Sequence, residues 1–141
     1  IMGDRVSVQF ENHMSKSVVL FHHWGGTQFP KFVLDWFKRF MKQAAIEGHH
    51  ERWQPHNILM PCIAEVALHY RGVKPGSVVM REGKFESTPL DSISPSIYLG
   101  KDEFDGDNTN HGNFLIHMNT MIMRNEDGDV VDADDHVEEY V

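Results

Sequence analysis

The sequence predicts an α+β fold of two layers, in which two amphipathic helices pack on one face of a mainly antiparallel sheet. Three observations lead to this prediction. Residues 5–21 contain two strand-like segments, residues 29–71 carry two helical apolar stripes, and short strands return after Gly72. The chain of 141 residues has the length of one domain, so we treat residues 1–141 as a single domain and expect its acidic tail, 132–141, to fray.

The first two elements are strands. Residues 5–10 (RVSVQF) alternate between polar and apolar side chains, which places Val6, Val8 and Phe10 on one face of a half-buried strand. The polar segment 11–16 is typical of a turn, and residues 17–21 (SVVLF) are typical of a second strand. We therefore predict an antiparallel hairpin with a loop of medium length.

A helical period begins at Phe29. Apolar residues recur at i, i+3, i+4 and i+7, while charged residues occupy the opposite face. Pro30 suits the first turn of such a helix, and Gly48 is a natural stop. The apolar stripe consists of Phe29, Phe32, Val33, Trp36, Phe37, Phe40, Met41 and Ala44. This segment is the strongest structural signal in the chain and predicts a helix that covers a sheet.

A second helix is predicted from about Asn57 to Arg71, with Gly72 ending it. Because proline lacks an N–H group, Pro61 should lie in or just before the first turn, so that the regular helix begins near Met60. Its apolar stripe consists of Ile58, Leu59, Cys62, Ile63, Val66, Ala67 and Tyr70.

The remainder of the chain has the pattern of short strands and turns. Residues 77–81 and 84–86 flank Glu82-Gly83, which is typical of a hairpin turn. Residues 96–99 and 113–124 supply further strands, and residues 125–129 form another turn. A long polar loop, KDEFDGDNTNHGN at residues 101–113, separates these last strands.

The composition of the chain limits which binding partners and which cellular compartment we expect. The formal net charge of −8 argues against nucleic-acid binding, which needs a concentrated basic surface. No apolar run approaches the roughly 20 residues that span a bilayer, and no signal-peptide pattern opens the chain, so we expect no membrane association. The single cysteine, Cys62, cannot form an internal disulfide and is consistent with the cytoplasm. Its place in an apolar stripe predicts an inert core thiol.

The segment HHWGG at residues 22–26 follows the second strand. Adjacent residues of a strand point to opposite faces, so one of His22 and His23 should face the core and the other solvent or a cleft. Trp24 either packs against the sheet edge or stacks on a planar ligand. The two glycines favour a structural turn over an anion-binding loop, because their spacing matches neither the dinucleotide nor the P-loop motif.

The sequence lacks the motifs of zinc sites, calcium-binding EF-hands and serine hydrolases. The histidines do not form the H-x-x-x-H or H-E-x-x-H spacing of zinc sites. The acidic loop fails the EF-hand pattern at Asn110 and Ile116, where glycine and glutamate are required. No G-x-S-x-G motif is present. We therefore expect neither a metal nor a cofactor.

Two motifs of the N-terminal half, Met2-Gly3-Asp4-Arg5 and His23-Trp24-Gly25-Gly26, carry a resemblance. They are similar to those of a family of short uncharacterised bacterial and bacteriophage proteins, which implies a phage-related protein. That family opens with Met-Gly-Asp-Arg and a β-hairpin, then has Thr-His-Trp-Gly-Gly, an amphipathic helix and an Arg-Trp pair like Arg52-Trp53. Here His22 replaces the usual threonine, and the acidic loop and the segment around His49-His50 have no counterpart.

The two motifs should meet in space. In an antiparallel hairpin the start of one strand lies beside the end of the other. The candidate ligand-binding residues at this edge of the sheet are Asp4, Arg5, His23, Trp24, Gly25 and Gly26.

Two classes of function fit these residues. The first is a non-enzymatic binding module for a small anionic ligand or a host protein. The second is a small hydrolase or transferase in which His23 acts as general base, Asp4 orients it and Arg5 holds an anion. We prefer the binding module because the sequence shows no activated nucleophile, complete metal set or cofactor loop. A homo-oligomer is compatible with both classes.

Overall fold

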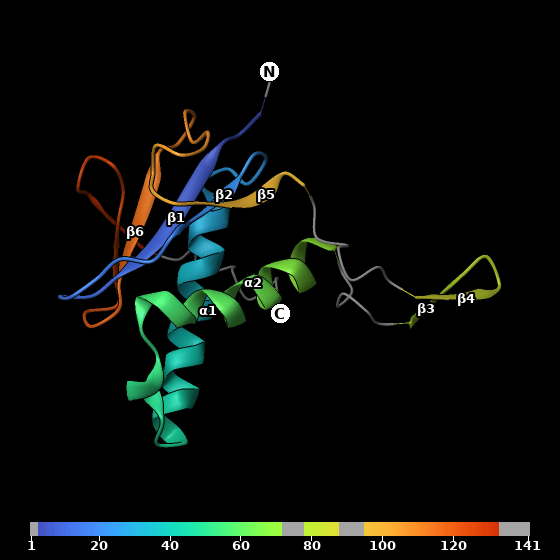
Figure 1. Cartoon of the computed structure of the whole chain (residues 1–141), viewed down its shortest axis with the longest axis horizontal. Helices are drawn as coiled ribbons and strands as arrows, with labels where there is room; N and C mark the ends of the chain where they lie inside the picture. Colours follow the sequence, from blue (N-terminus) through green and yellow to red (C-terminus); the bar gives the residue numbers. More distant parts are fainter. Residues whose placement is uncertain (1–2, 72–77, 88–94, 133–141) are drawn as a thin grey trace.

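The computed structural model describes residues 3–71, 78–87 and 95–132, so the tail from residue 133 lies outside it. Six of the described strands form one sheet in the order β5-β2-β1-β6-β7-β8. Figure 1 shows helices α1 and α2 packed with this sheet. Five neighbouring pairs form the sheet, and all are antiparallel except β1 with β6. The predicted α+β class and the mainly antiparallel sheet are confirmed.

The N-terminal hairpin consists of β1 (Val6–Glu11) and β2 (Val19–His22). Val6 pairs with His22 and Val8 pairs with Leu20, so the start of β1 lies beside the end of β2 as expected. On its other side β2 pairs with β5 (Ile97–Gly100).

The centre of the sheet differs from a simple meander. β1 lies next to β6 (Asn113–His117) in parallel, with Val8 opposite Phe114. β7 (Ile122–Arg124) and β8 (Val130–Val131) then complete the sheet. A parallel neighbour requires a long crossover, and here the crossover contains both helices.

Helix α1 (Gln28–Ile46) lies where the sequence predicts it and turns its apolar stripe toward the core, with Pro30 in its first turn. The helix ends in a Schellman motif. The Gly48 N–H donates to the carbonyl of Ala45 (3.1 Å), and the His49 N–H donates to that of Ala44 (3.0 Å). A short 3-10 helix, η1 (His50–Arg52), follows.

Helix α2 (Pro55–Arg71) begins earlier than predicted, and Pro61 lies inside it. Gln54 caps the helix, since its N–H donates to Asn57 Oδ1 (2.8 Å) and its carbonyl accepts the Ile58 N–H (3.0 Å). Pro55 at the first helical position has the φ angle that this start requires. The strong start at Gln54 outweighs the one backbone hydrogen bond that Pro61 cannot donate. In the described ranges, no helix is long and apolar enough to cross a membrane.

The core lies between the helices and one face of the sheet. The sheet contributes alternate residues, including Val6, Val8 and Phe10 of β1, as predicted. Helix α1 contributes among others Phe32 and Trp36, which are buried. Helix α2 contributes Ile58, Leu59, Cys62 and Val66. Both predicted apolar stripes therefore face one core.

The opposite face of the sheet is also covered, which the prediction of a half-buried β1 missed. Ser7 and Gln9, the polar residues of the alternation, are buried. Ser7 Oγ donates to Asn113 Oδ1 (2.7 Å) and accepts from Asn108 Nδ2 (2.9 Å). The ring of Phe21 is buried on this face as well. The polar loop 101–112 bonds to this face of the sheet as well, since the Gly112 carbonyl accepts the Ser7 N–H (3.1 Å) and the Asp107 N–H donates to the Tyr98 hydroxyl (3.0 Å).

The predicted hairpin around Glu82-Gly83 is present as β3 (Val78–Arg81) and β4 (Lys84–Ser87). Both turn residues have positive φ, +52° at Glu82 and +77° at Gly83, as a type I′ turn requires. These strands form a separate two-stranded sheet.

Candidate functional site

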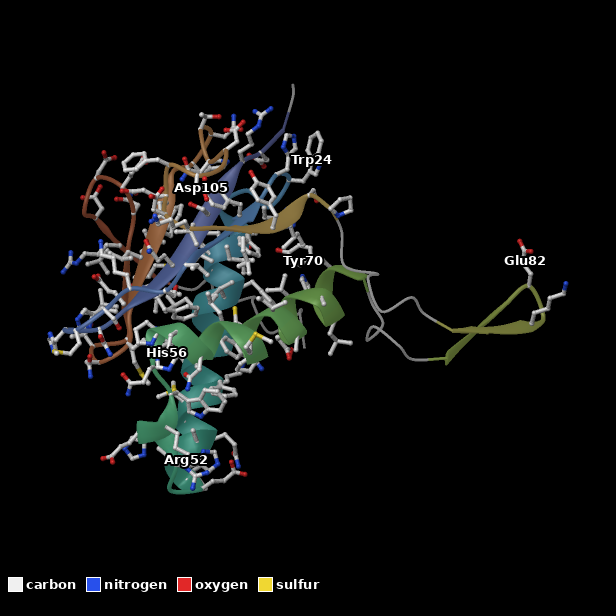
Figure 2. All side chains as sticks on the ribbon, viewed as in Figure 1. Trp24, Arg52, His56, Tyr70, Glu82 and Asp105 are labelled. Atoms are coloured by element: carbon white, nitrogen blue, oxygen red, sulfur yellow. The ribbon has the colours of Figure 1, made fainter. Side chains whose placement is uncertain are left out.

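The chain segment before β1 and the turn after β2 are joined by backbone hydrogen bonds. The Asp4 N–H donates to the His23 carbonyl (2.8 Å), and the Gly26 N–H donates to the Asp4 carbonyl (2.9 Å). The structure therefore brings together Asp4, His23 and Gly26, three of the six candidate residues. Figure 2 shows Trp24 at this end of the molecule and Arg52 at the opposite end.

Both glycines of the turn have structural reasons for their identity. Gly26 has a φ of +60°, and a Cβ atom there would lie 2.7 Å from Oδ2 of Asp4. A Cβ atom on Gly25 would lie 2.7 Å from the Cβ of Phe29. No larger residue fits either position without displacing a neighbour. The interpretation of these glycines as a structural turn is supported.

His22 belongs to the core, and His23 lies on the other side of the strand, as predicted. The buried His22 ring makes edge contacts with Phe29 (5.0 Å between centroids) and Tyr70 (4.7 Å). Its Nδ1 accepts the Trp24 N–H at 3.2 Å. Burial, with a smaller effect from the charge of His23, lowers the pKa of His22 to about 4. His22 is therefore neutral near pH 7 and fixes the backbone that carries Trp24.

His23 and Trp24 form the exposed side of the turn. Their rings meet edge to face with centroids 4.5 Å apart. The backbone of Gly3 lies close to the His23 ring, since a Cβ atom on Gly3 would lie 2.7 Å from Nε2. The Trp24 side chain is 58% exposed, which is high for a large aromatic residue on a fixed turn.

Arg5 is bound by the acidic loop. Its Nε lies 2.9 Å from Oδ2 of Asp107, and its Nη1 donates to Asn110 Oδ1 at 3.3 Å. The Arg5 backbone N–H donates to the same Asn110 oxygen at 2.9 Å. Hydrogen bonds from the hydroxyl and backbone N–H of Thr109 lower the pKa of Asp107, and the charges of Arg5 and His23 lower it further.

Asp4 pairs with a histidine that the sequence analysis did not single out. Its carboxylate contacts Nε2 of His111, whereas the enzyme hypothesis assigned Asp4 to orient His23. The His111 N–H donates to the carbonyl of Arg5 (3.0 Å), which extends the loop alongside the N-terminal segment. This loop segment, 107–111, is the part of the site that sequence reasoning missed. Only the strand topology identifies this segment as part of the site, because the β1–β6 pairing places the residues before Asn113 beside those before Ser7.

A polar cavity of about 360 Å³ adjoins this arrangement. It is lined by Thr27, which follows the glycine turn, by Asn110 and His111 of the loop, and by Glu126 and Asp127 of a later turn. In the part of the chain that the structure describes, no group of three or more His, Cys, Asp or Glu side chains is placed to hold a metal ion.

Cys62 does not take part in this polar chemistry. It is buried in the core, and burial raises the pKa of its thiol well above the ordinary value. It is therefore protonated and unreactive at neutral pH, as its apolar surroundings predicted.

Comparison of the chain with protein-family models, with curated proteins and with solved structures finds no match. The function is therefore inferred from the geometry and chemistry of the site itself.

Proposed function

We propose that the protein is a non-enzymatic binding module that engages a protein partner through the Trp24 surface. This surface comprises Asp4, Arg5, His23 and Trp24 together with loop residues 107–111. The observation that carries the proposal is the 58% exposure of Trp24 on a turn fixed by hydrogen bonds. An exposed tryptophan on a hydrogen-bonded turn, on a surface that also carries an arginine, is the kind of anchor that dominates the energy of protein interfaces.

The charges favour a protein partner over a small free anion. Arg5 already contacts the carboxylate of Asp107, and the carboxylate of Asp4 is 56% exposed nearby. A small anion would have to compete with Asp107 for the guanidinium group and would be repelled by both carboxylates. A protein surface can instead cover Trp24 and leave the Arg5 pair intact. In keeping with the resemblance to bacteriophage proteins, we expect a host protein in the cytoplasm.

The proposal is tested by substituting Trp24 in the complete chain. Trp24→Ala should change the free energy of unfolding by less than about 0.5 kcal/mol, because the side chain is exposed. The same variant should lower retention of the partner at least about tenfold in affinity capture from lysate of the host bacterium, quantified by mass spectrometry.

The matched control is Phe104→Ala, which removes an aromatic side chain that is 86% exposed outside this surface. It should retain the partner as the unaltered protein does. An identical set of captured proteins for Trp24→Ala would contradict the proposal. Sedimentation velocity of the purified protein would show whether a second copy occupies the surface, since a dimer lost in Trp24→Ala would identify it.

A second candidate function is the hydrolase or transferase, which the Asp4–His111 contact favours. A carboxylate that holds an imidazole is the arrangement of a general base, and here His111 takes the role proposed for His23. The nearby Thr109 hydroxyl, however, donates to Asp107 (2.8 Å) rather than to an imidazole. Hydrolysis of p-nitrophenyl acetate that exceeds the rate with free imidazole and is lost in His111→Gln would favour this alternative.

A further inference from the structure

The strand β5 forms one edge of the six-stranded sheet. It pairs with β2 on one side, and among the described residues no strand pairs with its other side. The β3–β4 hairpin belongs to a separate sheet, and Figure 1 shows it lying apart from β5. An unpaired strand edge offers backbone donors and acceptors to other chains, so it is a natural place for a strand to be added.

One hydrogen bond shows which backbone groups point to this edge. The His23 N–H donates to the Ser96 carbonyl at 2.9 Å, and these residues lie opposite each other in the register that pairs His22 with Ile97. In an antiparallel pair, residues that bond to the neighbouring strand alternate with residues whose backbone groups face away from it. Ile97 and Leu99 therefore direct their N–H and C=O groups toward the free edge.

The strand β5 is held in place, yet it lacks the protection that edge strands usually have. The ring of Tyr98 stacks on Phe21 with centroids 5.1 Å apart, and its hydroxyl accepts the Asp107 N–H at 3.0 Å. Residues 97–100 (IYLG) include neither a charged residue nor a proline. Charges and prolines are the usual means by which natural proteins prevent pairing at an edge.

An apolar side chain is exposed along this edge. Leu99 pairs with the buried Leu20, so its side chain lies on the helix side of the sheet. It is nevertheless 50% exposed, which shows that the helices leave this part of the edge accessible. Ile97 lies on the same side and is buried. A strand added at this edge would cover Leu99 and remove apolar area from water.

The stretch that can pair ends at Pro95 and at Lys101. Pro95 has no N–H group to donate. The Lys101 N–H already donates to Oδ2 of Asp105 at 2.9 Å. The two residues are equally far from Tyr98 in the sequence, one on each side. A two-fold axis at Tyr98 therefore places each of them opposite the other at an end of the pairing.

We propose that β5 pairs antiparallel with β5 of a second copy of the chain, about a two-fold axis at Tyr98, and so joins the two sheets. Ile97 then lies opposite Leu99 of the second copy, and the backbone groups of both residues point to the partner strand. Their side chains meet on the helix side. The Tyr98 rings of the two copies become neighbours on the other face, and aromatic cross-strand pairs stabilise sheets. A second copy is favoured because the same axis also matches Pro95 with Lys101, so neither end requires a further N–H bond.

The oligomeric state of the complete, purified chain tests this pairing. The interface is small, so sedimentation equilibrium should show a reversible monomer–dimer equilibrium at concentrations up to about 300 µM. Leu99→Lys places a charge on the edge, as natural edge strands do, and should raise the dissociation constant at least about tenfold. The control Ile122→Lys adds the same charge at an exposed residue of β7, which has a strand on each side, and should leave the dissociation constant unchanged.

A disulfide tests the register. The two copies of Tyr98 would form a non-hydrogen-bonded pair, whose Cα atoms lie about 4.5 Å apart, within the range that a disulfide bridges. Tyr98→Cys should therefore form a covalent dimer under mild oxidation. The control Val130→Cys is exposed on the other edge of the sheet and should form much less of it. Equal yields from the two variants would overturn the proposed register.

The dimer is distinct from the Trp24 surface. Trp24→Ala should dimerise as the unaltered protein does, because Trp24 lies outside the paired strands. A dimer that is lost in Trp24→Ala but kept in Leu99→Lys would place the contact at the Trp24 surface and contradict the pairing of β5. A chain that remains monomeric at the highest concentration, or a folded Leu99→Lys variant with an unchanged dissociation constant, would overturn the proposal.

Discussion

The two faces of the six-stranded sheet are buried by different means. One face is apolar and lies against α1 and α2, where side chains such as Val8 and Phe10 meet the helical stripes. The other face carries Ser7 and Gln9, which are buried beneath the polar loop 101–112 and the neighbouring strand. Apolar burial is non-directional and depends on area and packing, whereas the polar face depends on each donor meeting its acceptor.

The candidate site is continuous with the polar face. Arg5 shares its side of β1 with Ser7 by the strand alternation, and both bond to the loop, through Asp107 and Asn108 respectively. The loop that covers the polar face of the sheet therefore also positions the Trp24 surface. The helix-covered face, by contrast, contributes His22, which supports the turn from inside.

The largest expected effect tests the apolar face. Trp36 is 6% exposed and packs on Phe40 with ring centroids 4.9 Å apart. Trp36→Ala should lower the free energy of unfolding by about 3 to 5 kcal/mol, because it removes a large core side chain and leaves a cavity. Urea denaturation measures this loss. A cost below about 1 kcal/mol would show that α1 does not depend on this stripe.

The next effect concerns His22, a buried histidine at the edge of the apolar core. The pKa of His22 is about 4 in the folded state and near 6.5 when solvated, so the unfolded chain binds more protons between these values. The contribution of His22 to stability is therefore complete above about pH 6.5 and is lost as the pH falls toward 4. We expect a loss of about 2 to 3 kcal/mol.

Urea denaturation at pH 7 and pH 4.5 checks this pH dependence, with His22→Gln as the variant that cannot titrate. His69→Gln is the control, because the pKa of His69 is also lowered by burial but its ring is less buried. A pH dependence that persists unchanged in His22→Gln would assign the proton uptake to other groups.

The smallest effect tests the polar face. A Cβ atom on Gly106 would lie 2.8 Å from the buried ring of Phe21, so the loop packs directly on this ring. Gly106→Ala should cost about 1 to 2 kcal/mol, less than the core truncation because an exposed loop can shift. In Phe21→Leu the same substitution should cost clearly less, since the ring no longer fills the space. Additive costs in the double variant would show that the loop does not rest on Phe21.

The periodicity of apolar residues along the sequence correctly predicted which residues form the apolar face of the sheet and the helix that covers it. The α1 stripe, the alternation of Val6, Val8 and Phe10, and the Glu82-Gly83 turn all have local causes that a short window of sequence contains. The start of α2 was wrong because a cap at Gln54 and a proline at the first helical position outweighed the expectation from Pro61.

Only the part of the candidate site that belongs to the N-terminal hairpin could be predicted from the sequence. Hairpin geometry predicted that Asp4 would meet His23, and the backbone bond between them is present. The contacts of Asp107, Asn110 and His111 were missed because they depend on the parallel β1–β6 pairing. Composition marks that loop as polar, but no local pattern shows that it bonds to Arg5 and Ser7.

The parallel pairing also sets an order of assembly during synthesis. Ser7 and Asn113 pair across 106 positions of sequence, so β1 and β2 leave the ribosome long before β6 is made. Until then β1 has an unpaired edge, which can pair with other chains or recruit a chaperone. Arg5 likewise acquires its partners Asp107 and Asn110 late in translation. A chain interrupted before residue 107 would carry Trp24 without the loop that completes its surface, so a partner that contacts both would distinguish finished chains from nascent ones.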